Sequence, residues 1–194
     1  MRRILICCLG VGTLWAGELP GWWRSFPKVP GLESPFVQES ESSVFGKLRR
    51  EGTLRLAQGG RLRVEYRKGI QLVCDGHSLI QYDPEARTAQ RMDLRTAAST
   101  APMLNILVNP GTLAQTFTVS AGPGADAVTL KPIRPGVPTV ILEGQGGLLK
   151  RVRWTDATGA GQLLELKAPR ILARPDAGGF TFKAPAGTHW LGSI

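Results

Sequence analysis

The segment from residue 46 to residue 92 constrains the fold most strongly, because apolar and polar residues alternate there in short runs separated by turn dipeptides. In residues 61–67 (Arg-Leu-Arg-Val-Glu-Tyr-Arg), apolar side chains occupy every second position. Successive side chains of a strand point to opposite faces, so Leu62, Val64 and Tyr66 would share one surface. The sequence therefore predicts a sheet with one polar face and one apolar face that must be covered.

The remainder of the chain repeats this pattern of short strands and turns. Pairs such as Gly59-Gly60, Asp75-Gly76 and Asp83-Pro84 favour turns. Short, regularly spaced strands are typical of a barrel or a sandwich. The expected strands lie at residues 34–44, 46–58, 61–68, 70–75, 78–83, 86–92, 116–120, 127–132, 138–143, 148–156, 161–168 and, in a weaker pattern, 180–183.

Residues 96–115 interrupt the strand pattern. Pro102 suits a first helical turn, apolar residues after it share one helical face, and Asn109-Pro110-Gly111 ends the segment. A second short helix is expected near 111–114. An apolar helix in an all-strand chain is either a lid over an open barrel end or an ordinary core helix. The lid residues would be Met103, Leu104, Ile106 and Leu107.

Three segments in order resemble one known family. They are Gly-Gly-Arg-Leu-Arg-Val-Glu-Tyr (59–66), Leu-Val-Cys-Asp-Gly (72–76) and Leu-Ile-Gln-Tyr-Asp-Pro (79–84), with Phe-Thr-Phe before Pro-Ala-Gly near the C-terminus (180–187). Their order and spacing resemble the periplasmic outer-membrane lipoprotein carrier family (LolA-like proteins), over most of the chain after Ser34.

This resemblance implies a mainly β fold with short helices, an incomplete antiparallel β-barrel (half-barrel) with a helical lid. Its interior would hold acyl chains against a lining of Leu54, Leu62, Val64, Tyr66, Leu72, Ile80, Tyr82, Val152 and Trp154. The chain departs from the family at Gln58, where an arginine commonly ties the lid to the barrel, and at Val64 and Ile80, where tryptophan is common. Gln58 therefore occupies the position of the family's lid latch but lacks the charge of arginine.

The first residues predict a secretory signal. Met1-Arg2-Arg3 is basic, residues 4–15 are apolar but shorter than a membrane-spanning helix, and Ala16-Gly17 supplies small residues for cleavage. We expect a signal peptide at 1–16 and one domain at 17–194. A buried N-terminal element and lipidation at Cys7 or Cys8 are the alternatives. Trp22 and Trp23 would then either plug an apolar opening or lie loosely on the surface, with any helix there kept short by Pro27 and Pro30.

Composition and motifs argue against several classes of function, namely nucleic-acid binding, metal binding and catalysis. The net charge is +9, or +7 after loss of residues 1–16, but basic residues alternate along strands and no nucleic-acid motif is present, so we expect no nucleic-acid partner. His77 and His189 lack metal-ligand spacing, and no nucleophile elbow occurs, so neither metal, cofactor nor catalytic residue is expected. Cys74 would stand alone after cleavage, as a half-buried strand residue or, alternatively, a reactive thiol.

The resemblance to the lipoprotein carriers implies a periplasmic carrier, and the missing catalytic motifs predict that it is not an enzyme. It would shield the acyl chains of lipidated proteins and move them from the inner-membrane lipoprotein-releasing ABC transporter complex to an outer-membrane acceptor. The alternative is a membrane-anchored acceptor, or a lipid- or lipoprotein-sensing module, of the same fold. A lipid hydrolase is a third class, which ester turnover dependent on Asp75 or His77 would reveal.

Overall fold

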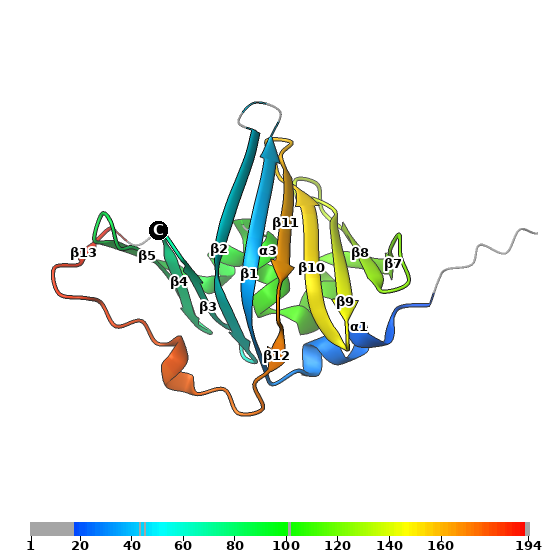
Figure 1. Ribbon diagram of the computed structural model, residues 1–194, viewed down its shortest axis with the longest axis horizontal. Helices are drawn as coiled ribbons and strands as arrows, with labels where there is room; N and C mark the ends of the chain where they lie inside the picture. The colour runs from blue at the N-terminus through cyan, green and yellow to red at the C-terminus, as the bar shows by residue number, and fades with distance from the viewer. Residues whose placement is uncertain (1–17, 43, 45, 101, 193–194) are drawn as a thin grey trace, which may run out of the picture.

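The computed structural model describes residues 18–42, 44, 46–100 and 102–192, so the predicted signal peptide lies outside the described residues. Within them, 13 strands form one curved sheet (Figure 1). The strands are β1 (Gly31–Ser42), β2 (Gly46–Ala57), β3 (Arg61–Tyr66), β4 (Gln71–Asp75), β5 (Ser78–Asp83), β6 (Thr88–Asp93), β7 (Phe117–Ala121), β8 (Ala127–Pro132), β9 (Val140–Gln145), β10 (Leu148–Thr155), β11 (Gly161–Leu166), β12 (Arg170–Ile171) and β13 (His189–Trp190).

The sheet is open. Its order is β13-β6-β5-β4-β3-β2-β1-β11-β10-β9-β8-β7, with β12 pairing only with β1. Neighbouring strands are antiparallel except β13, which runs parallel to β6. The two outermost strands, β13 and β7, do not pair with each other, which confirms a mainly β, incomplete barrel.

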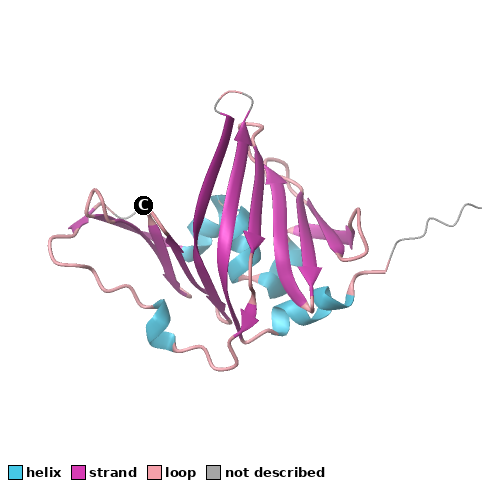
Figure 2. Cartoon of the chain, viewed as in Figure 1, coloured by secondary structure: helices cyan, strands magenta, loops and turns pink. Residues whose placement is uncertain are grey.

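Short helices occupy the concave side of this sheet, some behind the central strands and others at the lower end of the strands in Figure 2. They are α1 (Gly21–Ser25), η1 (Phe26–Lys28), α2 (Leu94–Thr100), α3 (Pro102–Val108) and η2 (Pro110–Gln115), whereas η3 (Ala177–Phe180) lies outside near the C-terminus. The helical segment predicted at 96–115 is therefore present, divided into three pieces. Its apolar residues complete the main core, in which Ile106 and Leu113 are fully buried.

Strand register explains the two faces. β1 and β2 pair over their full lengths, and Leu32 lies opposite Leu56 while Ser34 lies opposite Leu54. The next hairpin turns through Gly59 and Gly60, whose φ angles of +80° and +75° suit glycine because it has no Cβ. Leu54 then lies opposite Val64, so the apolar residues of three strands line the concave face.

The convex face is polar over its centre, and the C-terminal segment covers one side of it. Ion pairs join neighbouring strands there, for example Arg49 with Glu39 (3.3 Å) and Arg151 with Glu165 (3.3 Å). Such exposed pairs each contribute about 0–1 kcal/mol, so they mark a solvated surface more than a source of stability.

The C-terminal segment differs from its prediction. Residues 180–183 form no strand: η3 ends at Phe180, and Phe182 packs on Tyr82 with ring centroids 5.3 Å apart. The alternating aromatics that predicted a strand instead anchor an irregular segment to the outer face of the sheet. Figure 1 shows this segment running outside the strands to β13.

Candidate functional site

An apolar cavity of about 200 Å³ lies between the concave face and α3. Strands β1 to β4 form one wall, β10 and β11 form another, and α3 covers them. The lining residues are Phe36, Gln38, Leu54, Leu62, Val64, Tyr66, Leu72, Met103, Leu104, Leu107, Trp154 and Leu164. Apart from the polar groups of Gln38, Tyr66 and Trp154, this surface offers only hydrocarbon and a thioether.

Most of the residues predicted to line the interior meet at this cavity. From the strands these are Leu54, Leu62, Val64, Tyr66, Leu72 and Trp154, and from α3, the predicted lid, they are Met103, Leu104 and Leu107. Val152 and Ile106 are fully buried in the same core but do not line the cavity. Phe36, Gln38 and Leu164 were missed, although the alternation of β1 and β11 could have identified them.

Ile80 and Tyr82 do not belong to this lining. They lie on the opposite face of β5, in a small cluster with Ala89 and Phe182. Residues 79 and 80 are both apolar, so alternation alone allowed either to point inward. The register decides it, because Leu79 lies opposite Cys74, which faces the main core. The prediction for these two residues is therefore wrong, and the C-terminal segment covers them.

A hydrogen bond joins the two polar residues of the wall. The Tyr66 hydroxyl donates to Oε1 of Gln38 over 2.7 Å. Burial raises the pKa of Tyr66 above its ordinary value, while the nearby Arg50 guanidinium opposes that shift. The phenol therefore stays protonated at neutral pH and keeps its role as donor.

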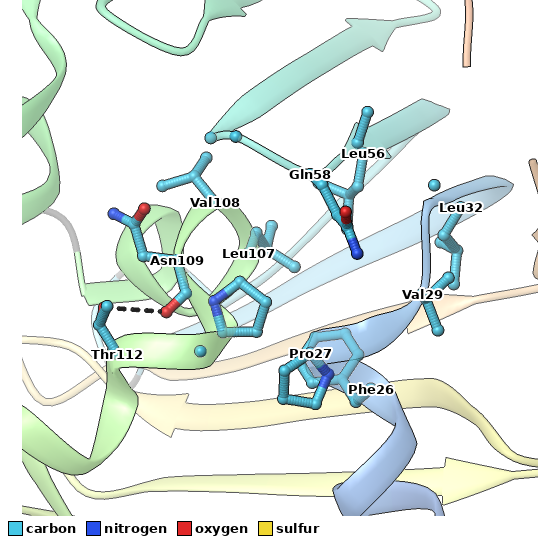
Figure 3. Close-up of a pocket in the computed structure, with 16 residues that line it drawn as sticks. Phe26, Pro27, Val29, Leu32, Leu56, Gln58, Leu107, Val108, Asn109 and Thr112 are labelled. Carbon is cyan, nitrogen blue, oxygen red and sulfur yellow. Dashed lines mark hydrogen bonds between the residues drawn. The ribbon is translucent and has the colours of Figure 1, made fainter. Parts of the chain in front are cut away.

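A second cavity, of about 250 Å³, lies at the end of the sheet where β2 turns into β3 (Figure 3). Residues of η1 and β1 bound it on one side, and residues 107–112 bound it on the other. Leu107 lines both cavities.

Gln58 lines this second cavity but does not tie α3 to the sheet. Its Nε2 donates to the carbonyl oxygen of Lys28 in η1 over 3.2 Å, and its own N–H donates to the carbonyl of Pro30. The predicted lid latch is therefore replaced by a contact with the N-terminal helical turn. Both acceptors, Lys28 and Pro30, lie in the segment before β1 and not in α3.

The sequence pattern of one family, described as outer membrane lipoprotein carrier protein LolA, matches residues 27–183. The chain belongs to the LolA family. This membership supports a lipoprotein-binding or carrier-type role in general. No curated protein matches the chain in sequence.

Two of the similar solved structures share the fold of this LolA-family chain, and a third superposes with a lower score. An uncharacterised conserved protein from Thermus thermophilus superposes with a TM-score of 0.52 at 11% identity, covering 87% of this chain and 93% of the other. A DUF1329 family protein from Desulfovibrio piger gives 0.51 at 8% identity, covering 82% and 92%. A LolA superfamily protein from Nitrosomonas europaea gives 0.48 at 10% identity, covering 83% and 96%.

Metal-ligand clusters, turn aspartates and long apolar helices can be assessed in the described part of the LolA-family chain. No group of three His, Cys, Asp or Glu residues there could hold a metal ion. Asp75, Asp83 and Asp156 each accept hydrogen bonds from backbone N–H groups of their own turns. No helix in this part is long and apolar enough to cross a membrane.

Proposed function

We propose that this chain is a periplasmic carrier of lipidated proteins. It would take the acyl chains of a lipoprotein from the inner-membrane lipoprotein-releasing ABC transporter complex, shield them from water, and pass them to an outer-membrane acceptor. No covalent step is needed, because both transfers only move hydrocarbon between apolar environments.

The apolar cavity under α3 carries this proposal. Burying a methylene group stabilises a complex by about 0.8 kcal/mol, so acyl chains would bind such a surface strongly. Leu62 is 1% exposed and Leu54 is 2% exposed, which shows how fully this wall is already excluded from water.

The size of the cavity indicates a closed state. Its volume of about 200 Å³ is below the roughly 300–1,000 Å³ of typical ligand pockets. Met103, Leu104 and Leu107 of α3 line the cavity on the side opposite the sheet. A bound chain would have to displace them, and ligand and lid would then compete for the same wall. This competition keeps the net affinity moderate and allows release.

A matched pair of substitutions tests the proposal. Leu72 and Leu163 are both half-buried strand leucines, but Leu72 lines the cavity and Leu163 lies on the convex face opposite Glu39. The purified variants Leu72→Glu and Leu163→Glu would be mixed with a peptide bearing a diacylglyceryl cysteine and separated by gel filtration. We expect the peptide to co-elute with wild type and Leu163→Glu and to be lost from Leu72→Glu.

Equal retention by both variants would show that acyl chains bind elsewhere. If wild type and both variants all failed to retain the peptide, the carrier function itself would be rejected. The mass of the N-terminus of the secreted protein separates a free carrier from an anchored acceptor, because a diacylglyceryl group on Cys7 or Cys8 is required for the latter.

A further inference from the structure

The concave face changes from apolar to polar at one level of the sheet. On β1 the inward residues are Leu32, Ser34 and Phe36, followed by Gln38 and Ser40. On β2, Arg50 lies directly opposite Gln38 and therefore on the same face. The apolar cavity consequently ends at a polar margin, where Gln38 belongs to its lining.

Arg50 lies beside this margin. Its guanidinium carbon is 6.0 Å from the centre of the Tyr66 ring, and Tyr66 lines the cavity. Arg50 is exposed, and no carboxylate of the described residues forms an ion pair with it. Its sequence neighbour Arg49 points to the convex face and pairs with Glu39 at 3.3 Å and Glu51 at 2.9 Å. The inward arginine thus keeps its donors available.

Gln38 supplies further donors. Its Oε1 accepts the Tyr66 hydroxyl, which fixes the orientation of the side-chain amide. No hydrogen bond from its Nε2 is formed within the described part of the chain. Asp156, on the loop after β10, is already engaged, because its carboxylate accepts from Thr158, Ala160 and Gln162.

We propose that Arg50 and Gln38 bind the anionic head group of an amphiphile, a carboxylate or a phosphate, whose acyl chain occupies the cavity under α3. This inference rests on the proposed function, since it assigns a subsite to the same cavity. Arginine presents several N–H donors in a planar fork that matches carboxylate and phosphate oxygens. The amide N–H groups of Gln38 add neutral donors at the inner side of the head group.

Displacement of the neutral fluorescent probe N-phenyl-1-naphthylamine would measure this preference. The ligands are dodecanoate, dodecyl phosphate and uncharged dodecanol, which share one chain length. Charge-assisted hydrogen bonds contribute enough to favour an anion by about tenfold over dodecanol in wild type. In Arg50→Gln this preference should fall to about twofold or less, with dodecanol affinity unchanged. A preference for dodecyl phosphate alone would identify a phospholipid-type head, and one for dodecanoate alone a fatty-acid head.

Arg49→Gln is the matched control, because it removes the same charge from the adjacent residue on the opposite face. It should keep the anion preference of wild type. Equal losses in Arg49→Gln and Arg50→Gln would overturn the subsite, since overall charge would then explain them. Equal binding of all three ligands to wild type would reject the subsite but leave the acyl-chain function standing. Failure of dodecanol and both anions to displace the probe would reject the cavity function as well.

Discussion

The indole ring of Trp22 lies directly on the backbone of Gly144. A Cβ atom at position 144 would come within 2.3–2.4 Å of Cδ2, Cγ and Cδ1 of the indole, so only glycine permits this contact. The indole N–H also donates to the carbonyl oxygen of Asp126 over 2.9 Å. The N-terminal helix α1 is thus fixed to β9, and Trp22 is 5% exposed within the main core.

We predict that Gly144→Ala destabilises the protein. The added methyl group must displace Trp22 or shift β9, and overpacking of this kind costs about 1–3 kcal/mol. Urea unfolding followed by tryptophan fluorescence would measure the loss. Gly124→Ala is the control, because a Cβ at Gly124 meets nothing within 4 Å. Equal midpoints for the two variants would show that the Trp22 contact adds no stability.

Leu107 lines both cavities, and we predict that Leu107→Ala joins them. Truncation of a buried leucine costs about 2–5 kcal/mol of stability, but it also opens a path from the cavity under α3 to the one beside η1. Affinity for a series of fatty acids from ten to sixteen carbons should therefore shift toward longer chains. The probe displacement assay measures this shift directly.

Leu104→Ala controls for the loss of a lid side chain. Leu104 and Leu107 belong to the same helix and are each 7% exposed, but Leu104 lines only the cavity under α3. Its truncation should raise affinity for all chain lengths alike, because it enlarges one cavity without extending it. The same length preference in both variants would contradict a partition at Leu107.

The alternation of residues 61–67 predicted both the strand and its inward face, because a strand with one buried face allows only one register. The position of α3 was also predictable, since the helical spacing of residues 103–107 stands alone among strands. The half-barrel was predicted from the resemblance to the lipoprotein carriers, because local patterns could not distinguish a barrel from a sandwich.

Long-range packing could not be predicted from local pattern. Leu79 and Ile80 are equally apolar, and only pairing with β4 decides which one faces the core. The prediction of a strand at 180–183 was wrong because it also depended on long-range packing. Phe180 and Phe182 pack against the sheet without joining it. Cys74, expected to be half-buried, is fully buried because its strand neighbours Leu62 and Leu79 belong with it to the main core.

We predict that Asp75→Asn lowers stability near pH 7 by about 1 kcal/mol or less, because solvent screens this exposed group. Hydrogen bonds from the N–H groups of Ser78 and His77, both 2.8 Å, hold the pKa of Asp75 below its ordinary value. A depressed carboxyl pKa stabilises the folded state above the pKa of the unfolded chain, about 3.9, and the effect is lost as pH falls through the folded value. Urea unfolding at pH 7 and below pH 3 should therefore give a difference between wild type and variant only at pH 7.

Cys74 should resist thiol reagents in the folded protein. It is 0% exposed, and burial raises the pKa of its thiol, so the reactive thiolate is scarce as well as shielded. Iodoacetamide labelling at pH 8, followed by peptide mass mapping of Cys74, should be slow in buffer and complete in urea. Rapid labelling of the folded protein would show instead that the core around Leu62 and Leu79 opens readily.

The same burial makes stability depend on alkaline pH. A raised pKa means that the folded state favours the neutral thiol, so this contribution is present below the unfolded pKa of about 8.5 and declines above it. The free energy of unfolding of wild type should therefore fall relative to that of Cys74→Ala between about pH 8 and pH 10. A constant difference over this range would mean that the folded protein ionises Cys74 as easily as the unfolded chain does, which its complete burial between Leu62 and Leu79 argues against.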